Sequence, residues 1–381
     1  MSSSMKERIR AALHAVEERA DAARRAVKRK TGLRDPIRPR PYRGWGAGST
    51  LHLSGRVLED EGVQDMGGDL ASRVWAMWKR YESDEIPGAR LEVRLGDRSR
   101  RVEADDEGYF ELAWEDVPLE APWTELSVQL LSPVNEDQDN PPVPARVRVP
   151  GPQAKIALVS DVDDTIVKTG ATDFLKHART VLLNDASSRE AFAGAGAFYR
   201  AIEAGRSGDE GNPVFYVSSS PWNLYSLFES FLELNDIPLG PIFLKDFGVD
   251  DDKLLKEGHT DYKVDRITRL IDAYPGLGFL LVGDSGQKDA WVFEEVVRQR
   301  QGRVLGCYLR DLDPSDADPE IAKIEARMRE RGTAMLRVPD MAQAARHATE
   351  QGWISDDARA AVERATDGRQ AAGDQPDASR R

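Results

Sequence analysis

Three carboxylates stand within four positions of the chain, at Asp161, Asp163 and Asp164. They follow the apolar segment KIALVS directly, and Thr165 comes next. Like charges this close repel one another, so the cluster is a poor arrangement for stability alone. Carboxylate oxygens are the ligands that Mg²⁺ prefers, and a bound cation would relieve the repulsion. Calcium loops also cluster aspartates, but the glycine and distant glutamate of their pattern are missing here. A solvated acidic turn is the alternative.

Four further groups follow apolar segments or open a predicted helix. PVFYV runs into Ser218, and LGFLLVG runs into Asp284, with Asp289 five residues later. GHTDYKVDRI places Lys263 at the start of a helix. Acidic strand ends, a hydroxyl and a lysine are the groups that phosphoryl transfer requires, because positioning and charge neutralisation do most of its catalysis. The pattern therefore predicts Mg²⁺-dependent phosphoryl transfer.

Two of these assignments leave alternatives open. Ser219 and Ser220 follow Ser218, so the functional hydroxyl could lie one position further along. Lys245 and Lys253 compete with Lys263, which we favour because it opens the helix before the strand that ends at Asp284.

The segments that must position these groups change character near residue 150. Short apolar runs without alternation, separated by helical stretches, predict an α/β domain with a parallel sheet covered by helices on both faces. Such sheets bind ligands at the ends of their strands. Before it, runs such as LHLSGRV and GYFELAW alternate with period two and predict an antiparallel β-sandwich of roughly five to seven strands. The chain accordingly divides into a basic N-terminal helix and linker (1–41), the β-sandwich (42–150), the α/β domain (151–350) and a polar, largely disordered end (351–381).

The motifs also match a known superfamily. Asp-x-Asp-Asp-Thr, the Ser-ended strand, the downstream lysine and the Gly-Asp-x-x-x-x-Asp strand end resemble the four motifs of the haloacid dehalogenase superfamily, whose catalytic domain is Rossmann-like. More narrowly, residues 156–311 resemble the catalytic domain of the actin-patch-associated phosphatidate phosphatases, which are relatives of the lipins. SDVDDTIVKTG, VFYVSSSPWNLYSLFESFL and LLVGDSGQKDAWVFEEVV carry this resemblance. Residues 55–150 are similar to the β-rich domain that precedes it in those proteins.

The resemblance implies catalytic roles for four side chains. Asp161 is expected to attack phosphorus and form an aspartyl-phosphate, which splits one difficult step into two. Asp163 is expected to protonate the leaving oxygen and later to take a proton from water. Ser218 should hydrogen-bond a phosphoryl oxygen, and Lys263 should neutralise charge shared by the nucleophile and the phosphoryl group.

The same resemblance implies Mg²⁺ as the cofactor. Asp161 and Asp284 should bind the ion, with the backbone carbonyl of Asp163 and water completing its coordination. Asp289 is expected to act as a partner of these ligands or as a ligand through water.

Composition limits the partners. The net charge is −13, but residues 1–43 hold 13 Lys and Arg against 5 Asp and Glu, so the remainder carries −21. An acidic body argues against nucleic acid as a partner, since nucleic acid requires basic grooves. The basic helix predicted for residues 5–30 could make transient contact with an anionic membrane, or pack on the sandwich, or self-associate. With one cysteine, no 18-residue apolar run and no secretory pattern, the expected location is the cytoplasm, with peripheral membrane contact open.

Phosphatidate is the substrate that the resemblance implies, with diacylglycerol and phosphate as products. A phosphatase of a soluble phosphomonoester or phosphoprotein is an alternative that shares every site residue. A non-catalytic lipid-sensing module is a second alternative, against which the intact Asp161, Asp163, Asp284 and Lys263 argue. Residues 169–212 are predicted to form either a small cap over the site or a helical pair packed on the sheet.

Overall fold

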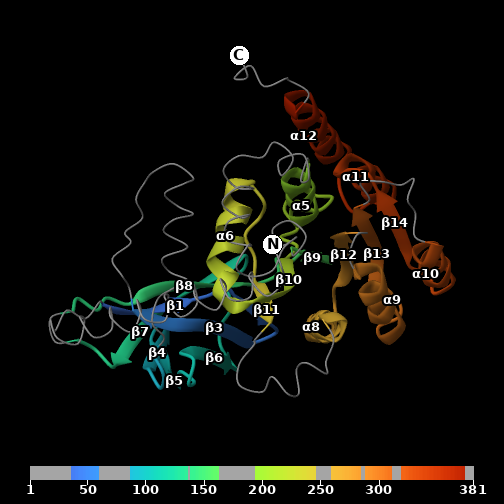
Figure 1. Cartoon of the computed structure of the whole chain (residues 1–381). Coiled ribbons are helices and arrows are strands. Elements are labelled where there is room, and N and C mark those ends of the chain that lie inside the picture. The colour runs from blue at the N-terminus through green and yellow to red at the C-terminus, as the bar shows by residue number, and fades with distance from the viewer. Residues whose placement is uncertain are drawn as a thin grey trace, which may run out of the picture.

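The computed structural model describes residues 36–59, 86–135, 138–162, 194–245, 259–284, 288–310 and 319–373 (Figure 1). The helix predicted for residues 5–30 lies outside these ranges, as does Asp163. Within them, every helix is too short or too polar to cross a lipid bilayer.

The N-terminal strands form one mixed sheet of eight strands. Their bounds are β1 (Ile37–Pro41), β2 (Gly44–Ala47), β3 (Thr50–Glu59), β4 (Arg90–Leu95), β5 (Arg98–Glu103), β6 (Tyr109–Trp114), β7 (Trp123–Ser132) and β8 (Val143–Arg148). They pair in the order β1-β3-β2-β8-β7-β4-β5, and β6 pairs with β3. All these pairs are antiparallel except β2 with β8, which run parallel. The predicted antiparallel sandwich of roughly five to seven strands is thus corrected to a mixed, mainly antiparallel sheet of eight strands.

The second sheet is entirely parallel. Its strands are β9 (Ile156–Asp161), β10 (Val214–Pro221), β11 (Ile242–Lys245), β12 (Gly278–Asp284), β13 (Val304–Arg310) and β14 (Ala334–Val338). They lie in the order β11-β10-β9-β12-β13-β14. After β9, the chain adds β10 and β11 on one side of that strand, and it then adds β12, β13 and β14 on the other side. The strand order therefore reverses at β9 and β12, and such a switch point is where doubly wound sheets bind ligands.

Helices cover both faces of the parallel sheet, as the continuous apolar strands predict. On one face lie α5 (Ala195–Ala204), α6 (Tyr225–Leu234), α11 (Met341–Glu350) and α12 (Asp356–Gly373), with the short helix η1 (Trp222–Leu224) before α6. On the other lie α8 (His259–Ala273), α9 (Asp289–Gln299) and α10 (Pro319–Glu330). Alternate residues of β9 enter the two cores, Leu158 with the first group and Ala157 and Val159 with the second. The described part of segment 169–212 includes α5, which packs on the sheet. Residues 169–193 lie outside the described ranges, and both alternatives for this segment stay open.

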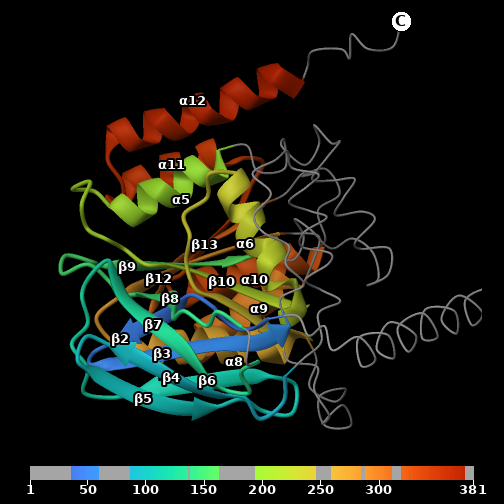
Figure 2. The same cartoon turned by 90° about the vertical axis from the view of Figure 1, so that its left-hand side faces the viewer.

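The polar segment that follows residue 350 is helical where we expected disorder. Helix α12 spans Asp356–Gly373 and lies across α11 and α5 (Figure 2). Ser355 caps its start by accepting a hydrogen bond from the Ala358 amide at 3.1 Å. Alanine, arginine and glutamate favour the helix. Val362 and Thr366, about one turn apart, are the buried residues among its described side chains. The disorder prediction is wrong for residues 351–373, because so few apolar residues left no visible amphipathic pattern.

Aromatic residues join the two sheets beside the end of β10. Tyr42, between β1 and β2, stacks on Trp222 with ring centres 4.9 Å apart and on Tyr225 at 4.1 Å. The Arg43 backbone N–H donates to the Tyr225 hydroxyl at 2.8 Å. Trp222 follows directly after β10, so this contact supports the chain just past the Ser218 region.

A buried arginine joins the sheets at the opposite end of the strands. The Arg148 side chain is 1% exposed and contacts Glu203 of α5 at 2.9 Å. Its guanidinium also donates to the carbonyls of Pro122 and Asn212, each at 3.0 Å. Burial raises the pKa of Glu203, and the charge of Arg148 opposes that rise. The contact with Arg148 therefore favours the charged form of Glu203 against the effect of burial.

Replacing Arg148 with alanine is expected to lower the free energy of unfolding by roughly 3 kcal/mol, because it removes the buried cation that pairs with Glu203 and donates to the Asn212 carbonyl. Urea unfolding measures this loss. Arg146→Ala is the matched control, since Arg146 is also on β8 but its partner Glu125 is equally exposed, at 60% for each side chain. We expect it to cost about 0.5 kcal/mol or less. Equal losses in the two variants would contradict the role given to burial.

Candidate active site

Asp161 is the last residue of β9, the central strand at which the sheet order reverses. Asp161 pairs in register with Val217 of β10. On the other side of β9, the preceding residue, Ser160, pairs with Val282 of β12. The Asp161 side chain is only 5% exposed. A buried carboxylate needs a partner, and a side chain from a neighbouring helix provides it here.

Lys263 is that partner, and it joins two carboxylates. Its Nζ lies 2.8 Å from Asp161 Oδ1 and 3.0 Å from Asp289 Oδ1. The three side chains are between 1% and 7% exposed. Lys263 lies in the first turns of α8, and Asp289 opens α9, where the helix N-terminus favours a carboxylate. The arrangement orients Asp161 and leaves the trio with net negative charge.

Asp289 uses its second oxygen to fix the end of β12. Its Oδ2 accepts a hydrogen bond from the Asp284 backbone N–H at 3.1 Å. Gly283 makes this approach possible, because a Cβ there would lie 2.4 Å from Asp289 Oδ2. Asp289 thus links Lys263 to the backbone of Asp284, which supports the expected role of orienting the ligands. Sequence reasoning missed Gly283, although a glycine inside an apolar strand marks close approach of another group.

Ser218 is fully buried at the same edge of the sheet. It follows Val217, the register partner of Asp161, and β10 continues from there to Pro221. The Ser218 hydroxyl accepts a hydrogen bond from the Ser220 amide at 2.9 Å. Ser220 is also buried and Ser219 is half-buried, so the one-residue alternative stays open.

The lysine alternatives occupy different places. Lys263 contacts Asp161 directly, whereas Lys245 ends β11, with β10 between it and β9. Lys245 is 6% exposed. Lys253 lies outside the described residues.

Two carboxylates end adjacent strands, and this arrangement fits a hard cation. Asp161 directly follows Ser160, and Asp284 lies two residues beyond Val282, the register partner of Ser160. Neighbouring strands lie about 5 Å apart. Lys263 balances one negative charge among Asp161, Asp284 and Asp289. The described residues contain no group of three His, Cys, Asp or Glu side chains already arranged around one point. Asp163, which the sequence adds to this site, is not among them.

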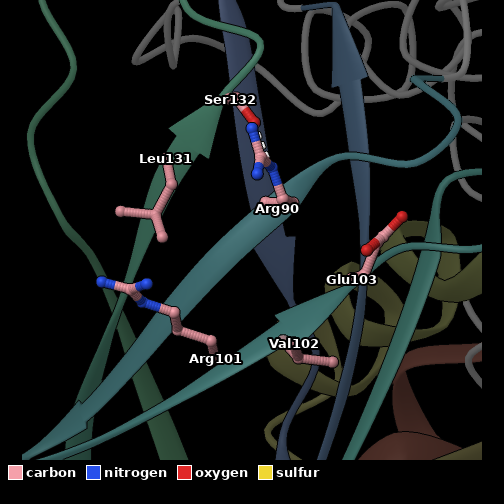
Figure 3. Close-up of a pocket in the computed structure, with 6 residues that line it drawn as sticks. All are labelled: Arg90, Arg101, Val102, Glu103, Leu131 and Ser132. Carbon is pink, nitrogen blue, oxygen red and sulfur yellow. Dashed lines mark hydrogen bonds between the residues drawn. The ribbon is translucent and has the colours of Figure 1, made fainter.

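A hollow elsewhere in the molecule contains none of these groups. It measures about 380 Å³ and lies on β4, β5 and β7 of the first sheet (Figure 3). Arg90, Arg101, Val102, Glu103, Leu131 and Ser132 line it, and Arg90 donates to the Ser132 hydroxyl at 2.9 Å. The predicted site residues Asp161, Ser218 and Asp284 lie instead on the parallel sheet.

Fold and site together define a doubly wound α/β domain with a lysine-paired acidic cluster at its switch point. Residues 156–311 match the family described as "Phosphatidate phosphatase APP1, catalytic domain". The resemblance predicted for residues 156–311 is thereby confirmed. Membership of the haloacid dehalogenase superfamily stays a prediction.

Two curated relatives match part of the chain. Phosphatidate phosphatase APP1 of Saccharomyces cerevisiae is 31% identical over 164 residues, which cover 43% of this chain and 27% of the relative. An uncharacterized protein of Schizosaccharomyces pombe is 23% identical over 161 residues, or 41% of this chain and 25% of its own. The chain thus matches about a quarter of the length of each. Among solved structures, a carbohydrate acetylesterase from Xanthomonas citri aligns over 84% of this chain and 71% of its own at 13% identity, with a TM-score of 0.32, which is too low to support an argument.

Proposed function

We propose that this protein is a Mg²⁺-dependent phosphomonoester hydrolase whose substrate is phosphatidate, with diacylglycerol and phosphate as products. One observation carries the chemistry: Lys263 Nζ lies 2.8 Å from Asp161 Oδ1 at the switch point of the parallel sheet. The family of residues 156–311 and the printed name of the yeast relative support the substrate.

Asp161 is the nucleophile in this proposal. Its carboxylate oxygen attacks phosphorus while the bond from phosphorus to the leaving oxygen breaks, and Asp163 gives that oxygen a proton. Water then attacks the aspartyl-phosphate, Asp163 takes the proton, and the bond between phosphorus and Asp161 breaks to release phosphate. Lys263 holds one oxygen of Asp161, which fixes the direction from which the other can reach phosphorus.

The phosphoryl oxygens need donors and positive charge. Ser218, buried beside Asp161, offers a hydroxyl for one of them. Lys263 offers a positive charge that water screens little, since its side chain is 7% exposed. Asp161, Asp163 and Asp284 would hold Mg²⁺, with Asp289 orienting Asp284. When bound, this ion neutralises charge on the phosphoryl group.

Release of phosphate from short-chain phosphatidate tests the proposal. We expect release that requires Mg²⁺, stops with EDTA and returns when Mg²⁺ is restored. The same assay on sugar phosphates, nucleotides and a phosphoprotein gives the control. Preference for a soluble substrate would replace phosphatidate by the first alternative. An absence of release from every substrate would favour the lipid-sensing alternative.

The basic segment at residues 5–30 bears on how the enzyme reaches a lipid. We propose transient contact of this segment with anionic membranes, a partner suited to its positive charge. Flotation with anionic vesicles, compared between the full chain and one lacking residues 1–40, measures the contact. Equal flotation would remove this segment from the mechanism.

A further inference from the structure

A hydrogen-bonded chain reaches the backbone of Asp161 from the helical side of the sheet. The Ser160 Oγ lies 2.9 Å from the Asp161 carbonyl oxygen and 2.7 Å from the Tyr199 hydroxyl of α5. Ser160 is 2% exposed and Tyr199 is 4% exposed, so water does not compete for these bonds. Ser160 interrupts an otherwise apolar strand, which is the sequence signal for this contact.

The direction of each bond follows from the number of protons. A carbonyl oxygen can only accept, so the Ser160 hydroxyl donates its one proton in a hydrogen bond to the Asp161 carbonyl. The Tyr199 hydroxyl must then donate to Ser160. Burial raises the pKa of Tyr199 to about 12, and the nearby charge of Asp161 adds to the rise. The phenol therefore keeps its proton, and the chain runs one way, from Tyr199 through Ser160 to the Asp161 carbonyl.

Strand pairing and helix packing fix both ends of this series of hydrogen bonds. Ser160 lies on the central strand, paired with Tyr216 of β10 and Val282 of β12. Helix α5, which carries Tyr199, packs against β9, α11 and α12. The peptide that joins Asp161 to Val162 is thus tied to a helix that supplies no group to the chemistry itself.

We propose that Tyr199, acting through Ser160, is a positioning residue that fixes the peptide of Asp161 and so the aim of its carboxylate. This inference rests on the proposed function. An error of about 1 Å at a reacting atom can cost on the order of 100-fold in rate. Removing one hydroxyl from the chain loosens the peptide less than that, and we expect kcat to fall about 10-fold with KM unchanged.

Tyr199→Phe, Ser160→Ala and the double variant test the chain, with Tyr216→Phe as the control. Tyr216 belongs to the same core and donates to the Pro238 carbonyl, so its variant also loses a buried tyrosine hydrogen bond. We expect kcat to fall in Tyr199→Phe but not in Tyr216→Phe. The double variant should lose no more than Ser160→Ala alone, since both changes break one chain.

Hydrogen exchange of the peptide covering residues 156–162 provides a measure that does not need turnover. Exchange should quicken in Tyr199→Phe and Ser160→Ala and stay unchanged in Tyr216→Phe. If Tyr199→Phe matches Tyr216→Phe in both exchange and kcat, or if the effects of Tyr199→Phe and Ser160→Ala multiply, the inference is overturned. A wild-type protein that releases no phosphate would overturn the proposed function, while the exchange result would still decide whether Tyr199 fixes this peptide.

Discussion

Replacement of Asp161 by asparagine is expected to lower phosphate release about 10⁴-fold or more, because the amide cannot attack phosphorus. Under the proposed mechanism no other group occupies the position of the nucleophile, since Lys263 holds the remaining carboxylate of the trio, Asp289, at 3.0 Å. Quenching the wild-type enzyme during turnover should trap phosphate on the protein in a form that hydroxylamine releases, and the variant should trap none.

The fold should survive this change. Breaking a buried ion pair is costly when a charge is left without a partner, but Lys263 keeps Asp289. We expect the free energy of unfolding to change by about 1 kcal/mol or less. Asp272→Asn on α8 is the matched control, because that carboxylate pairs with Arg300 at the surface, 2.6 Å away, and is remote from the chemistry. Phosphate release by Asp161→Asn at the level of Asp272→Asn would refute the assignment of the nucleophile.

The parts of the site that sequence could predict are local. An apolar run that ends in aspartate identifies Asp161 and Asp284 as strand ends, because burial and charge change within a few residues. Their meeting at one edge follows from parallel pairing, which the alternation of strands and helices predicts. The structure supplies the order, with β9 and β12 adjacent.

Contacts set by packing could not be predicted from sequence. The distance between Lys263 and Asp161 depends on how α8 sits on the sheet, and the bond between Tyr199 and Ser160 depends on how α5 does. The parallel pairing of β2 with β8 joins residues about a hundred positions apart, and no local pattern encodes that partner. Helix α12 had local signals, a serine cap and helix-favouring residues, but its few buried side chains hid them.

Replacing Lys263 by methionine is expected to lower kcat about 10²- to 10³-fold, the cost of removing one preorganised charged donor from a dry site. Methionine keeps the length and apolar stem of lysine, so lost packing does not explain the effect. Without the cation, Asp161 and Asp289 each lose the buried ion pair that they make with Lys263. Kinetics on short-chain phosphatidate, with urea unfolding in parallel, measure both consequences.

Two further variants separate the charge of Lys263 from its position. Gly283→Ala keeps every charge but pushes Asp289 away, since the added Cβ would lie 2.4 Å from its Oδ2. We expect an intermediate loss in kcat, because Lys263 keeps Asp161 but loses the carboxylate that orients it. Lys155→Met is the control: Lys155 precedes β9 at the opposite end of the strand, pairs with Glu210 at 3.3 Å, and its side chain is 73% exposed. If Lys155→Met and Lys263→Met reduced kcat equally, the effect would belong to the fold and not to the charge beside the nucleophile.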